Sequence, residues 1–285
     1  MVHDHARLET NLERLASRCL NKWYGYGNTN GEMWFIGREE GGAEVWRDKM
    51  RRKNPCTLEQ SLELRSHFHR AMDFQYVWRE KYHYSREDLK RLRASGNCWR
   101  YIAAYILSVR RGNCSALSDP RERKGEINDF IDREFGRKDS HHFLCESFPL
   151  PLKRHTSKEY KEWYKGCLGD FRGYKAEVKR IRFDGIFELL VRSNEVKLVV
   201  SFSEEFNKWL IKNRKEEMIP IDHWCLHKRL YRYFGLRLDR YRHVGVLMTP
   251  FFGQGLAYSD LCKSSLRAHQ LAAPGQVPGR IGRSY

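Results

Sequence analysis

The sequence predicts an α/β fold in which a short, mostly parallel four-stranded sheet lies between helices. Four short apolar segments have the composition of buried strands, and amphipathic helical patterns separate them. Apolar residues make up 41% of the chain and charged residues 31%, a balance that excludes a disordered or fibrous protein. A chain of 285 residues can bury one large core. We therefore expect a three-layer α/β/α sandwich.

Each predicted strand is short, apolar and rich in β-branched or aromatic residues. Continuous apolar runs of this kind are typical of strands that are buried on both faces of a parallel sheet. The four segments are 33–37 (MWFIG), 142–145 (HFLC), 196–202 (VKLVVSF) and 244–249 (VGVLMT).

Helical patterns precede and separate these strands. Apolar residues recur at helical spacing over 8–19, 99–109 and 127–135. Gly136 ends the third pattern in the manner of a helix C-cap. Ser203 is a suitable N-cap for a further helix, because two glutamates follow it.

The chain is predicted to form one domain over residues 1–271. Residues 47–139, between the first two strands, are interpreted as a helical insertion, and the Gly- and Pro-rich residues 272–285 as a flexible tail. The longest stretch without Asp, Glu, Lys or Arg is 243–259, and it is too polar and glycine-rich to span a membrane. No signal peptide is visible, so we expect a cytoplasmic protein. We also expect it to be a monomer.

Eight cysteines are spread along the chain and never lie closer than sixteen residues. This spacing lacks the C-x-x-C pairs of zinc and redox sites and argues against an iron–sulfur cluster. We expect scattered buried thiols rather than a disulfide framework. The histidine pairs at 67 and 69 and at 141 and 142 lack carboxylates at ligand spacing, so no metal and no other cofactor is predicted.

Positive charge is the first indication of function. Lys and Arg number 53 against 36 Asp and Glu, which gives a net charge of +17. The segments 153–182 and 208–242 each hold ten Lys/Arg against four Asp/Glu, with aromatic residues between them. Basic side chains contact phosphates and aromatic rings stack on bases, so we expect DNA as the partner, with Lys153 and Arg154 among the contacts. The alternative is that these charges are solvated helix faces over a core.

The first predicted strand runs into a glycine-flanked loop at a carboxyl end, where α/β proteins bind ligands. Its glycines permit close approach of the main chain. Its adjacent carboxylates, Glu39 and Glu40, offer a general base or a negative charge beside a developing cation. The loop is neither a Walker motif nor G-x-G-x-x-G. The alternative is an ordinary turn with solvated glutamates. The loop runs Gly37-Arg38-Glu39-Glu40-Gly41-Gly42.

Two further loops follow predicted strands at the same edge. The second strand runs into Glu146, with Phe148 two residues later. The fourth strand runs into Thr249 and an apolar loop. If exposed, the large apolar residues of that loop would insert as a wedge into a base stack, and burial in the core is the alternative. These residues are Phe251, Phe252 and Leu256.

Together the four segments resemble the uracil-DNA glycosylase superfamily. The shared features are the glycine-flanked loop, a polar residue followed by Pro-Leu after the second strand, the VVSF strand with a helix behind it, and an x-Pro loop after the fourth. The family's first loop has forms such as G-Q-D-P-Y or G-E-A-P-G and places a carboxylate or amide near the sugar and the attacking water. Gly37 and Gly41 match this frame, although the family's proline is absent. The resemblance implies Glu39 as the first catalytic candidate and Glu40 as the second.

The resemblance also implies a pocket for a base flipped out of DNA. The family's second loop commonly carries an Asn that recognises uracil, and Glu146 falls at about that position. The last loop commonly begins His-Pro-Ser or Asn-Pro-Ser, where this chain has Thr249 before Pro250. An ionised Glu only accepts hydrogen bonds, so it suits the amino group of cytosine better than uracil. We therefore expect a modified cytosine of the kind found in phage DNA. The alternative is that Glu146 only pairs with a Lys or Arg.

The implied reaction is monofunctional cleavage of the N-glycosidic bond, which leaves an abasic site and would serve in antiviral defence. Glu39 or Glu40 would stabilise the cation-like sugar, and main-chain N–H groups or Thr249 would bond the departing base. Gly37 would form part of the base pocket, with Trp46 and Phe148 as stacking faces. Two alternatives are a non-catalytic nucleic-acid-binding module of the same fold and a metal-dependent nuclease.

Overall fold

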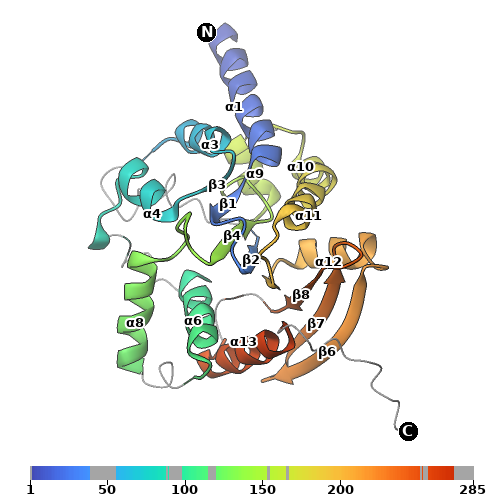
Figure 1. Cartoon of the computed structure of the whole chain (residues 1–285). Coiled ribbons are helices and arrows are strands. Elements are labelled where there is room, and N and C mark those ends of the chain that lie inside the picture. The colour runs from blue at the N-terminus through green and yellow to red at the C-terminus, as the bar shows by residue number, and fades with distance from the viewer. Residues whose placement is uncertain are drawn as a thin grey trace.

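The computed structural model describes residues 2–38, 56–87, 89, 98–114, 120–152, 155–164, 167–250, 252 and 256–272. The predicted α/β class is confirmed, but the expected four-stranded sheet is wrong. The sheet has eight strands and is mixed, in the order β3-β1-β4-β2-β5-β8-β7-β6 (Figure 1).

The four predicted strands form the centre of this sheet. They are β2 (Met33–Gly37), β4 (His142–Glu146), β5 (Leu198–Ser201) and β8 (His243–Met248). β2 pairs in parallel with both β4 and β5, and β5 pairs in parallel with β8. The prediction of parallel buried strands is therefore confirmed for these four segments.

The remaining strands extend the sheet on both sides. β1 (Trp23–Gly27) pairs antiparallel with β4 and parallel with β3 (Arg70–Met72). β6 (Met218–Leu226) and β7 (Arg229–Arg237) form an antiparallel hairpin, and β7 pairs antiparallel with β8. These strands lack a continuous apolar run: β1 contains two glycines, β6 is mostly exposed or half-buried, and β7 mixes buried and exposed residues. Half-buried and glycine-containing strands carry a weaker pattern than buried ones.

Helices cover both faces of the sheet (Figure 1). On one face pack α6 (Cys98–Arg111), α8 (Pro120–Arg133) and α13 (Tyr258–Ala272). The other face carries α1 (Val2–Lys22), α3 (Leu58–His67), α9 (Ser157–Tyr164), α10 (Phe171–Glu177), α11 (Phe183–Arg192) and α12 (Glu204–Asn213). Short elements complete the order: α4 (Phe74–Tyr76) and the π-helical turns η2 (Val77–Lys81) and η3 (Val178–Arg182). The segment 47–139, expected to be helical, also contributes strand β3.

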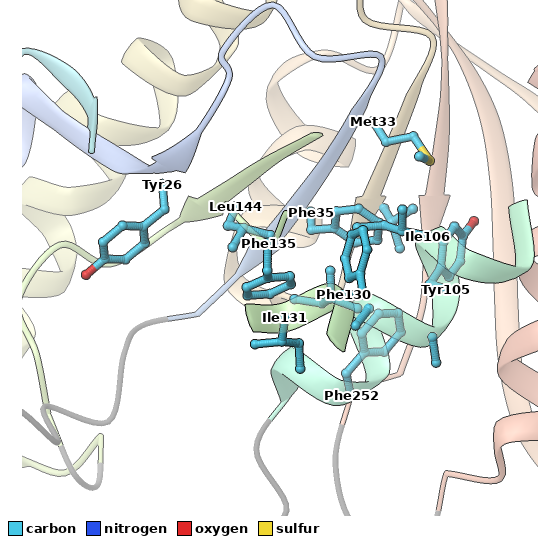
Figure 2. Close-up of a cluster of buried hydrophobic side chains, with 14 of the residues drawn as sticks. Tyr26, Met33, Phe35, Tyr105, Ile106, Phe130, Ile131, Phe135, Leu144 and Phe252 are labelled. Atoms are coloured by element: carbon cyan, nitrogen blue, oxygen red, sulfur yellow. The ribbon is translucent and has the colours of Figure 1, made fainter. Parts of the chain in front are cut away.

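An aromatic cluster fills the space between the sheet and α6 and α8 (Figure 2). Phe35 of β2 points to this side and meets Tyr105 edge-on, with ring centroids 5.4 Å apart. Its neighbours Trp34 and Ile36 point to the opposite core. Phe252 stacks on Phe202 at 4.7 Å. Both faces of β2 are thus packed, which explains why its sequence is continuously apolar.

One pair of cysteines departs from the expectation of free thiols. Cys114, just after α6, forms a disulfide with Cys262 of α13, with Cα atoms 5.6 Å apart. The two lie 148 residues apart in the chain, so sequence spacing carries no signal for this bond. The other six cysteines are free, and four of them are buried, as expected.

Within the described residues, no helix combines the length and the apolar character needed to cross a lipid bilayer.

His142 gives the fold a predictable sensitivity to acid. Its buried ring accepts the Gly136 N–H at 2.9 Å through Nε2, and burial, with smaller contributions from Arg110 and His141, lowers its pKa to about 3. In the unfolded chain this histidine binds a proton near pH 6.5, whereas in the folded chain it stays neutral. The free energy of unfolding therefore falls as the pH falls from about 6.5 towards 3. This group alone contributes a loss of up to about 1.4 kcal/mol per pH unit.

Replacing His142 with Gln retains an acceptor for Gly136 and removes the titration. Urea unfolding at about pH 7 and about pH 5 is expected to show a smaller loss of stability for His142→Gln than for the wild type, by about 2 kcal/mol. Equal losses in the two proteins would show that His142 is protonated without penalty in the folded state.

Candidate functional site

The carboxyl ends of β2, β4, β5 and β8 lie at one edge of the sheet, because the four strands are parallel. Gly37 of β2 is in register with Glu146 of β4. At the other side the N–H of Thr249 donates to the Ser201 carbonyl at 2.9 Å. In the sheet, β2 has β4 on one side and β5 on the other. The chain first passes from β2 to the β4 side of the sheet and later crosses to the β5 side, so this edge contains a topological switch point. Open α/β sheets bind ligands at such a point.

At the centre of this edge, neighbouring side chains pack close to Gly37, which has no side chain of its own. A Cβ placed there would lie 3.0 Å from Cε2 of Phe202 and 3.8 Å from Oε2 of Glu146. The ring edge of Phe202 and the half-buried carboxylate of Glu146 therefore border the same position, above the end of β2. The Phe202 ring thus fills the space that a side chain at this position would take, and the Glu146 carboxylate lies beside it as a hydrogen-bond acceptor.

Main-chain hydrogen bonds join the loops that follow β2 and β4. The N–H of Ser147 donates to the Gly37 carbonyl at 3.0 Å, and the N–H of Phe148 donates to the Arg38 carbonyl at 2.6 Å. Ser147 Oγ also donates to the Arg38 carbonyl at 3.1 Å. These bonds hold the Glu146 loop in a defined position relative to Gly37.

A serine pair continues this network to α12. Ser147 Oγ lies 2.8 Å from Ser203 Oγ, which caps α12 and accepts the Phe206 N–H. Because the Ser147 proton is directed to the Arg38 carbonyl, Ser203 donates in this pair. Three of the four loops at the edge are thereby joined through buried groups.

Arg182 supports the same loop from below. Its fully buried guanidinium donates to the Glu146 carbonyl, at 2.9 Å from Nε and 2.5 Å from Nη2. Nη1 donates to the carbonyls of Cys19, Leu20 and Trp23. Burial lowers the pKa of Arg182 from its usual value. The side chain thus ties the end of β4 to the end of α1.

Arg38 connects the loop after β2 to the first turn of α12. Its Nη2 atom lies 3.3 Å from Oε1 of Glu205, with both side chains partly exposed. An ion pair of this exposure adds little stability.

The structure places three predicted site residues at this edge: Gly37, Glu146 and Thr249. Thr249 is 8% exposed and its hydroxyl donates to the Pro250 carbonyl at 2.6 Å, so this hydroxyl is already engaged. Six other predicted site residues lie outside the described residues, namely Glu39, Glu40, Trp46, Lys153, Arg154 and Phe251.

Three predicted contact residues are buried instead of exposed. Phe148 is 1% exposed and packs on Phe183 and Tyr174, so its ring faces the core rather than a ligand. Phe252 is fully buried beneath Phe202, and Leu256 is 5% exposed. In this structure neither offers a wedge surface, because an apolar side chain beside a large core gains more from packing than from solvent exposure.

Sequence reasoning missed four residues that build the edge: Phe202, Ser147, Ser203 and Arg182. Phe202 and Ser147 directly follow strands that end at this edge, which is a signal that the sequence does carry. Ser203 was expected only as a helix cap. Arg182 lies in a basic segment that favoured surface contacts, and nothing local marks it as buried.

Among the described residues, no three His, Cys, Asp or Glu side chains are grouped as a metal site would require. The chain matches no protein-family model, no curated protein and no solved structure. The resemblance to the glycosylase superfamily therefore depends on the sequence motifs.

Proposed function

We propose that this protein is a monofunctional DNA glycosylase that removes a flipped, modified pyrimidine of the cytosine type. The observation that carries the proposal is the position of the Glu146 carboxylate beside Gly37 and the Phe202 ring, at the carboxyl edge of four parallel strands. The fold and the charge of +17 agree with this function.

The proposed roles follow from the chemistry of each group. The flipped base would lie at this edge beside the Glu146 carboxylate, outside the space above Gly37 that the Phe202 ring fills. Glu146 would accept a hydrogen bond from the exocyclic amino group, which cytosine has and uracil lacks. Bond cleavage makes the sugar cation-like, and Glu39 or Glu40 would stabilise it and orient the attacking water. Phe148, expected as a stacking face, is buried in the core and takes no part in the proposed site.

An abasic-site assay tests the reaction and its substrate. The protein is incubated with DNA that contains uracil, cytosine, 5-hydroxymethylcytosine or its glucosylated form, in EDTA, and the DNA is then cleaved with alkali. Wild type is expected to produce breaks at a modified cytosine. Glu146→Gln is expected to lose about 10- to 100-fold of this rate, as for one lost base contact, and Glu39→Gln or Glu40→Gln about 100- to 1000-fold.

Two controls sharpen the test. Glu216→Gln removes an exposed carboxylate that lies past the C-terminal end of α12, at the other end of this helix from Ser203, and is expected to keep the wild-type rate. Gly37→Ala places a methyl group against the Phe202 ring, which is stacked on Phe252, and is expected to reduce excision and to cost about 1–3 kcal/mol of stability. No abasic sites on any substrate, with DNA binding retained, would indicate the non-catalytic module. Backbone breaks that appear only with divalent metal would indicate the nuclease.

A further inference from the structure

A groove of about 760 Å³ lies between two helical walls on the α12 side of the sheet. One wall consists of α10, the π-helical turn η3 and the start of α11, and the other consists of α12 (Figure 1). Five cationic side chains and three carboxylates line it. The cations are Lys175, Lys179, Arg180, Lys208 and Lys212, and the carboxylates are Asp184, Glu204 and Glu205.

All three carboxylates of the groove already have cationic partners. Glu204 pairs with Lys208 at 2.5 Å, Asp184 with Arg214 at 3.2 Å, and Glu205 with Arg38. These pairs leave no acidic group in the groove uncompensated. Arg38 and Arg214 do not line the groove, but they neutralise two of its carboxylates. The net positive charge at the groove is therefore greater than its five lining cations and three lining carboxylates alone would give.

Three lysines of the groove have no carboxylate partner among the described residues. Arg180 pairs with Glu177 at 2.8 Å, whereas Lys179 and Lys212 make no ion pair in that part of the chain, and Lys175 lies only over the Phe171 ring, at 5.2 Å. Uncompensated cations on facing walls repel one another, which an anionic ligand between them would relieve. The groove therefore has the charge of a phosphate-binding surface.

The lysines are spaced as a repeating ligand requires. Lys175 and Lys179 on one wall, and Lys208 and Lys212 on the other, are each four residues apart, which is about 6 Å along a helix. Stacked strands of duplex DNA rise about 3.4 Å per nucleotide, and unstacked strands are more extended. A spacing of about 6 Å is wider than this stacked rise, so the two rows suit the phosphates of an extended, unstacked strand.

The lysine spacing favours one strand over a duplex, because about 6 Å exceeds the rise of about 3.4 Å between stacked nucleotides. The groove also begins beside the candidate site, because Glu205 lines it and binds Arg38, the residue after Gly37.

We propose that this groove binds single-stranded nucleic acid through its phosphates, with Lys175, Lys179 and Lys212 as the principal contacts. A strand that leaves the Gly37 edge would enter it. The path of the strand from the Gly37 edge into the groove rests on the proposed function. Strand binding in the groove does not, since a strand can bind whether or not a base is cleaved.

Fluorescence anisotropy of a labelled oligothymidylate of about twelve nucleotides tests the groove, with KCl varied at each protein concentration. Each lost phosphate contact reduces the slope of log K against log salt by about 0.7 for single strands, so Lys179→Ala/Lys212→Ala is expected to reduce it by about 1.4 and to weaken binding at least about tenfold near 0.1 M KCl. The control, Lys124→Ala/Lys263→Ala, removes two exposed lysines from α8 and α13 on the opposite face and is expected to change neither value appreciably.

Several outcomes would overturn the proposal. They are absence of binding by the wild type, equal losses in the two double variants, tighter groove-dependent binding of a duplex, and competition by polyglutamate as effective as by unlabelled oligonucleotide. The last would identify an acidic peptide as the ligand. If the protein binds a strand through the groove but forms no abasic sites, strand binding by the groove is supported and the glycosylase function is contradicted. Failure of one proposal can therefore be told apart from failure of the other.

Discussion

Arg182→Met is expected to lower the free energy of unfolding by about 3 kcal/mol or more. The guanidinium donates to four main-chain carbonyls, of Glu146, Cys19, Leu20 and Trp23, and is fully buried. Methionine matches its bulk but leaves these carbonyls without their donor, at about 1–3 kcal/mol for each buried group left unsatisfied. The variant recovers the cost of burying a cation, which offsets part of this loss.

Two neighbouring variants separate the causes of this effect. Arg182→Lys retains the charge but not the planar fork that reaches several carbonyls, so it is expected to remain clearly destabilised. Arg180→Met, in the same π-helical turn, removes an exposed cation that pairs only with Glu177 and is expected to change stability by less than about 0.5 kcal/mol. Urea unfolding measures all three. A wild-type value for Arg182→Met would show that the carbonyls find other donors.

The same substitution connects stability to the site. Arg182 holds the main chain of Glu146, the last residue of β4, and so determines where the Glu146 carboxylate lies relative to Gly37. Its own position depends on the π-helical turn η3, a type of irregularity that is frequent at functional sites.

Gly25→Ala is expected to destabilise the protein by about 3 kcal/mol or more. Gly25 lies in β1 between β3 and β4, with φ +153°, and a Cβ there would lie 1.8 Å from the Leu144 carbonyl oxygen. The obstacle is the main chain of β4, so no side-chain rotation relieves it, and the strands must separate or the hydrogen bonds between them must break.

Gly125→Ala is the matched control, because the same substitution is expected to stabilise the protein there. Gly125 lies inside α8, and nothing lies within 4 Å of a Cβ placed there. Alanine is the better helix former, so this variant is expected to gain about 0.5–1 kcal/mol. Thermal or urea unfolding of the two variants beside the wild type measures the contrast. Similar stabilities for both would mean that β1 does not approach β4 as closely as described.

The sequence predicted the central strands well because their local pattern reports burial on both faces. Met33–Gly37 and Leu198–Ser201 are continuous apolar runs, and each is fully buried. The pattern fails for β1 and β6, where glycines or exposed residues dilute it. At the edge, the sequence indicated Gly37 and Glu146, because residues after parallel strands converge wherever the strands pair.

The sequence by itself determined the α/β class, the four parallel strands, the cap at Ser203 and the basic surface, since each depends on composition or on neighbours within a few residues. Only the tertiary structure decided the eight-stranded order, the burial of Phe148 and Phe252, the placement of Phe202 beside Glu146 and the carbonyl partners of Arg182. Those features join residues up to 163 positions apart, as in the bond from Arg182 to Cys19. Periodicity along the chain reports which face of an element is buried, and it carries no information about which distant element covers that face.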